Sequence, residues 1–230
     1  MDNRPCILST KKLLTNQKQY LLNAGFGVIE ADFILTTPLD FETEHIYSSF
    51  IFTSQNAVNS VLRNSVAHIL KTKKIFCVGI KTKQLLETNG FKVTACTNYA
   101  SELAQIITEK YNTEKFTFFS GNLRMDTLPN AMKQADIPFT EITVYKTTLT
   151  PVKIQPEING ILFFSPSGVE SYLQENTITN QTCFCIGTTT AQALKNITDK
   201  IVIASKPTIE NVIIKAIKHY NKTLISHDKK

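Results

Sequence analysis

Phe52-Thr-Ser-Gln-Asn-Ala-Val-Asn-Ser-Val-Leu62 is matched 111 residues later by Phe163-Phe-Ser-Pro-Ser-Gly-Val-Glu-Ser-Tyr-Leu173. Each copy ends a short apolar run with a polar turn and continues with apolar residues at i, i+3 and i+4, the spacing of a helix that buries one face. A strand that leads through a polar turn into a helix is the repeating unit of a parallel sheet. The two copies therefore predict an α/β fold built from a duplicated unit.

The same alternation extends along the whole chain. Apolar, β-rich runs predict strands at 5–9, 27–34, 49–53, 74–78, 91–95, 116–120, 139–146, 160–164, 182–186 and 200–204. Helical spacing follows most of them, at 11–23, 55–63, 80–88, 100–110, 124–135, 188–196 and 208–220. Strands that alternate with helices indicate a parallel sheet covered on both faces.

Further echoes between the halves support the duplication. Phe76-Cys-Val-Gly-Ile-Lys-Thr-Lys-Gln-Leu-Leu86 is similar to Phe184-Cys-Ile-Gly-Thr-Thr-Thr-Ala-Gln-Ala-Leu194, and Leu8-Ser9 and Glu30 are echoed by Phe119-Ser120 and Glu141. Residues 1–112 and 113–230 then either fold separately or exchange their first pieces, about 4–36 and 115–147. The residues alone leave both assemblies open.

Composition limits the class of protein. The chain has 230 residues, 42% of them apolar and 19% charged, which is typical of a globular protein. The first five residues lack the apolar core of a signal peptide, and no run approaches the ~18–20 apolar residues of a membrane helix, so we expect a soluble, cytoplasmic protein without a membrane partner. The net charge of +6 suits an anionic partner, but no nucleic-acid-binding motif is present. We interpret the basic clusters as solvated surface: Lys71, Lys73, Lys74 and the tail Lys229-Lys230.

Cysteine and histidine do not indicate a metal site. An odd number of cysteines in strand-like settings argues against a disulfide framework, so we expect buried, reduced thiols at Cys6, Cys77, Cys96, Cys183 and Cys185. No ligand spacing connects the four histidines, His45, His68, His219 and His227. We therefore expect no structural metal.

Polar turns at the ends of strands are the candidate binding residues. No dinucleotide fingerprint, Walker loop, nucleophile elbow or carboxylate pair is present. Instead, hydroxyl and glycine residues lie where ligands bind in open α/β sheets, and each turn opens a helix whose free N–H groups favour an anion. In a single turn such residues more commonly cap the helix or relieve the backbone, but five turns in two repeats favour an anion-accepting cleft. The expected binding residues are Thr53, Ser54, Gly79, Thr82, Gly121, Asn122, Ser165, Ser167, Gly168, Gly187, Thr188 and Thr189.

Several motifs, taken together, resemble the uroporphyrinogen-III synthase family. They are Phe52-Thr-Ser-Gln-Asn-Ala-Val58, Val78-Gly-Ile-Lys-Thr82, Gly121-Asn-Leu-Arg124 with Leu128-Pro129, Ile142-Thr-Val-Tyr-Lys-Thr147, Phe163-Phe-Ser-Pro-Ser-Gly-Val169, Ile186-Gly-Thr-Thr-Thr-Ala191 and Pro207-Thr208. The fifth and sixth of these are the distinctive pair. The first half departs from the second at Val78-Gly-Ile-Lys-Thr82, which lacks the paired threonines of the later turn.

The resemblance implies the exchanged assembly. It predicts two flavodoxin-like parallel-sheet domains joined by a two-stranded linker. Residues 1–36 and 152–226 would form the first domain and 44–146 an inserted second domain, with linkers at 37–43 and 147–151 and a tail at 227–230.

The resemblance also implies a reaction. The substrate would be hydroxymethylbilane, closed to uroporphyrinogen III with inversion of ring D through a spiro intermediate and loss of water, by a monomeric hydro-lyase of haem biosynthesis that uses no cofactor and receives its substrate from the preceding enzyme. Tyr145 would face the ligand as a weak general acid, although a strand tyrosine more commonly packs on a sheet. Arg124 would meet a carboxylate, unless it is merely solvated. The alternatives are a two-domain α/β ligand-binding protein without catalysis and a sugar-nucleotide transferase, for which acidic metal ligands are missing.

Overall fold

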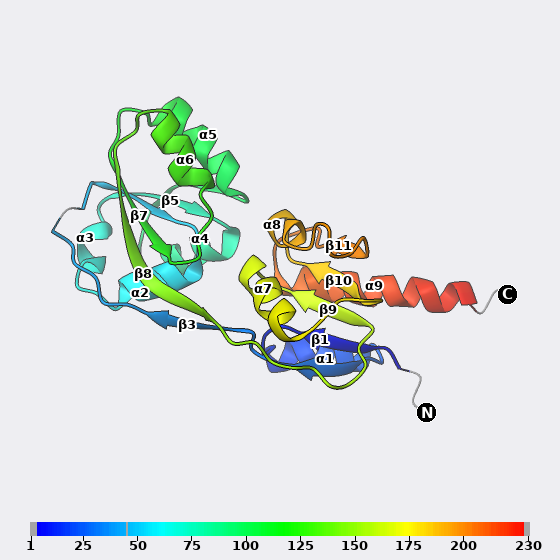
Figure 1. Ribbon diagram of the computed structural model, residues 1–230. Coiled ribbons are helices and arrows are strands. Elements are labelled where there is room, and N and C mark those ends of the chain that lie inside the picture. The colour runs from blue at the N-terminus through cyan, green and yellow to red at the C-terminus, as the bar shows by residue number, and fades with distance from the viewer. Residues whose placement is uncertain (1–3, 45, 228–230) are drawn as a thin grey trace. The chain divides into compact units, whose positions relative to one another are not determined.

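The computed structural model describes residues 4–44 and 46–227, with side chains up to Asn221; the expectations for His45, the His227 side chain and the Lys229-Lys230 tail lie outside this description. The chain forms two compact units (Figure 1). Unit 1 contains the described residues up to Leu35 and from Thr148 onward, and unit 2 contains Thr36–Thr147.

Unit 1 is built on one parallel sheet. Its strand order is β11 (Ile201–Ile203), β10 (Thr182–Cys185), β9 (Gly160–Phe163), β1 (Cys6–Ser9) and β2 (Gly27–Glu30). The helices are α1 (Thr15–Asn23), α7 (Pro166–Glu175), α8 (Thr188–Gln192) and α9 (Ile209–His227). Alternate residues of the strands point to opposite faces, which divides the core into two layers.

One layer of unit 1 packs beneath α7 and α8, and the other beneath α1 and α9. The first contains Leu8, Ile161, Phe163, Cys183 and Cys185 together with Val169 and Tyr172 of α7. The second contains Ile7, Leu162 and Phe184 together with Leu21 of α1 and Val212, Ile213 and Ala216 of α9. Each large apolar side chain buried in this way contributes about 1.5–3 kcal/mol.

Unit 2 repeats the arrangement with a six-stranded sheet. Its order is β3 (Ile34–Pro38), β8 (Phe139–Leu149), β7 (Phe116–Gly121), β4 (Ser49–Phe52), β5 (Lys74–Val78) and β6 (Val93–Thr97). The pairs from β8 to β6 are parallel. One face packs against α2 (Gln55–Leu62), α3 (Ala67–Leu70) and α4 (Ile80–Thr88). The other packs against α5 (Ala100–Lys110) and α6 (Thr127–Gln134).

Strand pairing follows the exchanged assembly. β1, from the start of the chain, pairs with β9 of the second half, and β7 pairs with β4 of the first half. The orders β2-β1-β9-β10-β11 and β8-β7-β4-β5-β6 are therefore the same when the repeats are superimposed, and both are the flavodoxin-like order. The boundaries between the units fall inside β3 and β8, which are neighbours at the sheet edge. The predicted linker segments, 37–43 and 147–151, begin within these two strands.

The structure differs from the predicted elements at a few positions. The predicted strand 27–34 is two strands, β2 and β3, because the chain changes partner from β1 to β8 after Phe33. The predicted helix 11–23 begins only at Thr15, since carboxylates of β2 and the following loop accept the preceding backbone N–H groups. The short helix α3 was not predicted, and α8 ends at Gln192 rather than at 196.

The cysteines are buried less uniformly than expected. Cys77, Cys183 and Cys185 are buried as predicted, and burial raises the pKa of both Cys183 and Cys185 to about 12, which keeps these thiols protonated. Cys6 and Cys96 are only half-buried, which corrects the prediction for these two residues. The reason is their position: Cys6 begins its strand, and Cys96 lies on the edge strand β6.

Candidate functional site

The predicted polar turns lie at the carboxyl ends of the parallel strands. In unit 2, Thr53-Ser54 follows β4, Gly79 follows β5 and Gly121 ends β7. In unit 1, Ser165 to Gly168 follow β9, and Gly187 to Thr189 follow β10. The chain runs outward in opposite directions from the adjacent pairs β4/β7 and β1/β9, so each pair is the switch point of its sheet, where open α/β sheets bind ligands.

At the switch point of unit 2, Ser54 connects a helix cap to Tyr145. Ser54 is the N-cap of α2, and its Oγ accepts a hydrogen bond from the Ala57 N–H at 3.1 Å. The same oxygen lies 3.1 Å from Tyr145 Oη and donates to it. Since the phenol oxygen accepts this bond, the Tyr145 proton is left to donate elsewhere. The half-buried Tyr145 is thus prepared to act as a hydrogen-bond donor.

Gly121 makes the space in which the Tyr145 ring lies. A Cβ atom at position 121 would lie 2.3 Å from Tyr145 Cζ and 2.8 Å from its Oη, far inside van der Waals contact. The β7/β8 register also shifts here, from Ser120 opposite Thr143 to Gly121 opposite Tyr145. A bulge of this kind redirects a side chain. The glycine and the bulge together determine where the phenol sits.

Asn122 and Arg124 are used internally. The Asn122 side chain accepts from the Thr147 N–H at 2.7 Å and donates to the Thr147 carbonyl at 3.1 Å, which ties the loop to β8. Arg124 donates through Nε and Nη2 to Glu141 at 2.5 and 2.7 Å, and it also pairs with Asp126. The prediction gave Arg124 a carboxylate of the substrate as partner, whereas in the structure its guanidinium is already paired with two carboxylates of the chain itself.

Glu141 is the site residue that the sequence reasoning missed. Its Oε1 also accepts a hydrogen bond from Ser120 Oγ at 2.7 Å. The hydrogen bond from Arg124 lowers the pKa of Glu141 below its ordinary value, and the same bond raises the pKa of Arg124. The echo of Glu141 in the repeat, Glu30, was the available signal.

Gly79 and Thr82, two predicted binding residues, have roles in the fold: one forms a tight turn and the other is buried. Gly79 has φ of +90°, the left-handed region that favours glycine, and its N–H donates to the Thr97 carbonyl at 2.7 Å. The Thr82 side chain is buried, so the structure does not expose its hydroxyl to a ligand. Thr82 is thus a poor candidate for substrate binding.

Unit 1 offers capping hydroxyls and an open glycine turn. Ser165 is the N-cap of α7, accepts from the Gly168 N–H at 3.0 Å and lies 3.0 Å from Ser167 Oγ. Gly187 precedes α8, and no heavy atom lies within 4 Å of a Cβ built there. Thr188 and Thr189, which follow it, are both exposed. The hydroxyls of Ser165, Ser167, Thr188 and Thr189 are therefore at least partly accessible and chemically able to donate hydrogen bonds.

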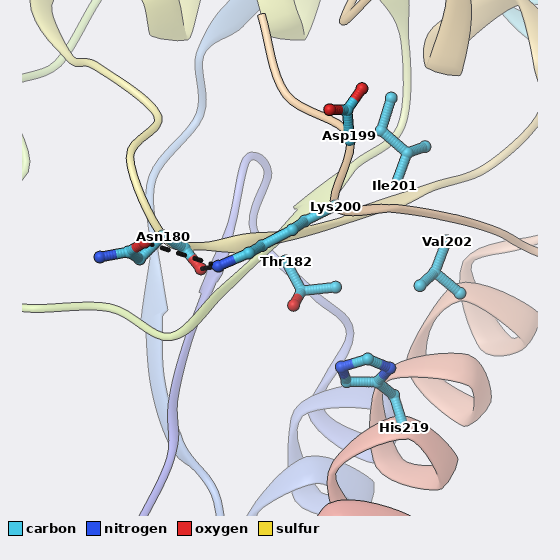
Figure 2. A pocket seen from close by; sticks show the side chains of 7 residues that line it. All are labelled: Asn180, Thr182, Asp199, Lys200, Ile201, Val202 and His219. Atoms are coloured by element: carbon cyan, nitrogen blue, oxygen red, sulfur yellow. Dashed lines mark hydrogen bonds between the residues drawn. The ribbon is translucent and has the colours of Figure 1, made fainter.

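Two hollows in the surface lie at the opposite ends of the strands. The first, of about 390 Å³, lies in unit 1 where β10 and β11 begin, and His219 of α9 also lines it. Figure 2 shows the Lys200 side chain directed at Asn180, and its Nζ donates to the Asn180 carbonyl at 3.3 Å. The other, of about 510 Å³, lies in unit 2 where β4, β5 and β7 begin, and includes the exposed Lys73 and Lys74. Neither contains any of the predicted site residues.

The polar turns can bind an anion, and Tyr145 can donate a proton. Among the described residues, no cluster of three or more His, Cys, Asp or Glu could hold a metal ion. The described helices also include none with the length and apolar character needed to cross a membrane.

Comparison with known proteins gave one family. The family model for uroporphyrinogen-III synthase HemD matches residues 16–214. The porphyrin biosynthesis protein HemD of Ruminiclostridium josui is 26% identical over 193 residues, which are 74% of this chain. The chain spans only 38% of the length of that relative.

Solved structures share the fold. Uroporphyrinogen-III synthetase from Helicobacter pylori superimposes with a TM-score of 0.69 at 19% identity, covering 94% of this chain and 99% of the other. A mutant uroporphyrinogen III synthase from Thermus thermophilus gives 0.68 at 13% identity, covering 95% and 99%. Both have mixed α/β structures with parallel sheets of the kind described above.

Proposed function

Because the chain belongs to the uroporphyrinogen-III synthase family, we propose that it cyclises hydroxymethylbilane to uroporphyrinogen III, as a hydro-lyase of haem biosynthesis. The observation that supports this most directly is the arrangement of Ser54, Gly121 and Tyr145 at the switch point of unit 2. It supplies one proton donor beside hydrogen-bonding turns. The proposed enzyme acts as a cytoplasmic monomer, with 37–43 and 147–151 as its linkers.

The proposed reaction begins with loss of the ring A hydroxyl. The C–O bond breaks, the oxygen leaves as water with the proton of Tyr145, and an azafulvene cation remains. The substituted carbon of ring D attacks this cation to form a spiro intermediate, which fragments and recloses with ring D inverted. The proton released when the final pyrrole becomes aromatic again restores Tyr145.

Tyr145 suits a modest acid role. The Ser54 hydroxyl donates to its oxygen, which stabilises the phenolate left behind and leaves the phenol proton for the departing hydroxyl. Hydroxymethylbilane also closes without a catalyst, to the uninverted type I isomer. The main task of the enzyme is therefore to hold one conformer, and orientation of this kind contributes up to ~7–11 kcal/mol.

The turns are proposed to bind the acetate and propionate arms. Ser165, Ser167, Thr188 and Thr189 are partly or fully exposed and offer hydroxyls, and main-chain N–H groups of the same turns add donors. Charge-assisted bonds from such donors are stronger than neutral ones. No titrating residue is needed for this contribution.

The test is the identity of the product. Purified protein, with no added metal or nucleotide, is given hydroxymethylbilane, and the product is oxidised and its isomers resolved. We expect mainly the type III isomer, against type I in the control without enzyme. A type I product at the control rate, with tight binding of the tetrapyrrole, would instead favour the ligand-binding alternative.

Tyr145→Phe tests the acid. It keeps the ring and removes the proton, so turnover should fall by up to about 10²-fold, the lower end for general acid catalysis, while the product remains type III. Tyr47→Phe is the matched control, since Tyr47 is also half-buried in unit 2 but precedes β4. Equal turnover in the two variants would make Tyr145 a structural residue.

A further inference from the structure

The loop after β1, residues 10–14, lies at the switch point of unit 1 but contains none of the predicted site residues. A ligand at the carboxyl edge of the β1/β9 pair would meet the loops after both strands. The predicted residues include the turn after β9 but none of the loop after β1, residues 10–14. The following argument deepens the proposed function, because it takes a polycarboxylate as the ligand.

The loop after β1 lies directly against the turn after β9. Thr10 donates to the Leu162 carbonyl through both its N–H, at 3.1 Å, and its Oγ1, at 2.8 Å. Thr10 Oγ1 is also 3.6 Å from the position a Cβ would take on Gly168. The backbone of the next residue, Lys11, is therefore adjacent to a residue that contacts the predicted Ser165 to Gly168 turn.

The backbone of this loop is held in place. Ser9 Oγ donates to the Lys11 carbonyl at 2.6 Å, and the Lys12 N–H donates to Asp32 Oδ1 at 2.8 Å. The Leu13 N–H donates to Glu30 Oε1 at 2.7 Å. A backbone fixed in this way loses little conformational entropy when a ligand binds, so the entropic cost is limited to the lysine side chains.

The cationic side chains of the loop remain exposed. Lys11 and Lys12 are both exposed, and within the described residues neither forms an ion pair. Glu30, the carboxylate that binds the loop, is already paired with Lys18 at 2.5 Å. The turns predicted to bind ligand in unit 1 contain only serine, threonine, glycine and proline, so these lysines are the nearest cations in sequence to that switch point.

The internal repeat gives independent support. Ser9, Leu13 and Glu30 stand 111 residues before Ser120, Arg124 and Glu141, and in both units the glutamate binds the same loop position. In unit 2 the glutamate binds the Arg124 guanidinium and neutralises it. In unit 1 the glutamate accepts a hydrogen bond from the Leu13 N–H and pairs with Lys18 of α1, so neither Lys11 nor Lys12 is held in an ion pair as Arg124 is, although the charge of Lys12 acts on Glu30 from a distance.

We propose that Lys11 and Lys12 form a carboxylate-binding site at the switch point of unit 1, which takes acetate or propionate arms of the tetrapyrrole substrate. The two lysines supply positive charge, and the Ser165 and Ser167 hydroxyls supply hydrogen-bond donors on the neighbouring turn, which the loop contacts through Thr10. This division gives the unit a modest, salt-dependent interaction with polycarboxylates without any buried charge.

The test compares two double variants with the same change in net charge. Lys11→Gln/Lys12→Gln removes the proposed site, whereas Lys73→Gln/Lys115→Gln removes two exposed lysines from the amino end of the unit 2 sheet. Binding of uroporphyrin, with eight carboxylates, is followed by fluorescence at low and high salt. At low salt, two exposed charge contacts predict about 2- to 30-fold weaker binding for the first variant and little change for the second. High salt should shrink the difference.

The outcomes separate the site from the proposed function. Equal affinity of both variants and the parent protein at low salt would overturn the site, even if the parent makes the type III isomer. Equal weakening of both variants would overturn it too, because overall charge would then explain the loss. A parent protein that makes no type III isomer would refute the function, while the uroporphyrin measurement would still decide the site. Unfolding midpoints check that both variants are folded.

Discussion

Gly121→Ala is the substitution that most directly tests the geometry around Tyr145. The backbone at Gly121 is outside the left-handed region, so alanine is allowed there by its dihedral angles. The obstacle is the ring: the new Cβ would lie 2.3 Å from Cζ and 2.4 Å from Cε2 of Tyr145. Carbon atoms pack at about 3.5–4.0 Å, so the ring must move by about 1 Å or more.

Two effects follow from this movement. Overpacking of a tightly packed position costs about 1–3 kcal/mol of unfolding free energy. The hydroxyl moves with the ring, since it too would lie 2.8 Å from the new Cβ, and the 3.1 Å bond from Ser54 is lengthened or misaligned. A misplacement of about 1 Å in a reacting group can lower the rate by ~10²-fold. Gly121→Ala should therefore lose as much turnover as Tyr145→Phe.

The assay combines urea unfolding with isomer-resolved initial rates. Gly27→Ala is the control, because the nearest atom to a Cβ there would be Cys6 Sγ, at an ordinary 3.6 Å, and Gly27 is outside the site. The destabilisation caused by Gly121→Ala should disappear when Tyr145 is also changed to alanine, since the clashing atoms are then gone. Wild-type turnover in Gly121→Ala, or the same loss of stability in the Tyr145→Ala background, would refute this reasoning.

Two more predictions concern buried thiols and the Arg124 anchor. Cys183→Ala should cost about 1–2 kcal/mol through lost packing and leave isomer selectivity intact, whereas a folded variant without selectivity would show that the thiol takes part in the site. The pKa of Glu141 is lower in the folded protein than in the unfolded chain, where it is near 4.3, so the charged carboxylate stabilises the fold fully at pH values above about 4.3. This stabilisation is lost as the pH falls through the lower, folded-state pKa. Urea unfolding of wild type and Glu141→Gln should therefore differ at pH 7 and converge toward pH 3, and a pH-independent difference would contradict the assignment.

The fold class and most elements were predictable because their signals are local. Apolar alternation and helical spacing are read within windows of about a turn or strand, and the strands β4, β5 and β7 and helices α2, α4 and α5 lie within a residue or two of their predicted ranges. The start of α1 was mispredicted because the N–H groups of Lys12 and Leu13, which precede it, bind Asp32 and Glu30, residues outside any local window.

The candidate site was predictable only as a set of residue types. The sequence placed hydroxyl and glycine residues at strand ends, and they are there. It did not reveal that Asn122 is occupied by Thr147, that Thr82 is buried, or that Arg124 already holds a carboxylate. Each of these contacts depends on a partner that is distant in sequence or on burial by another element.

The sequence by itself determined the α/β class, the duplication and the polar turns, because all three are written in short-range patterns and their repetition. Only the tertiary structure decided which halves pair, since β1 beside β9 and β7 beside β4 are associations between distant segments. It also decided the setting of Tyr145: Ser54 lies 91 residues away in sequence, and Gly121 is required because the ring occupies the position that a Cβ would take at the bulge. Such contacts depend on residues far apart in the sequence, which come together only when the whole sheet packs.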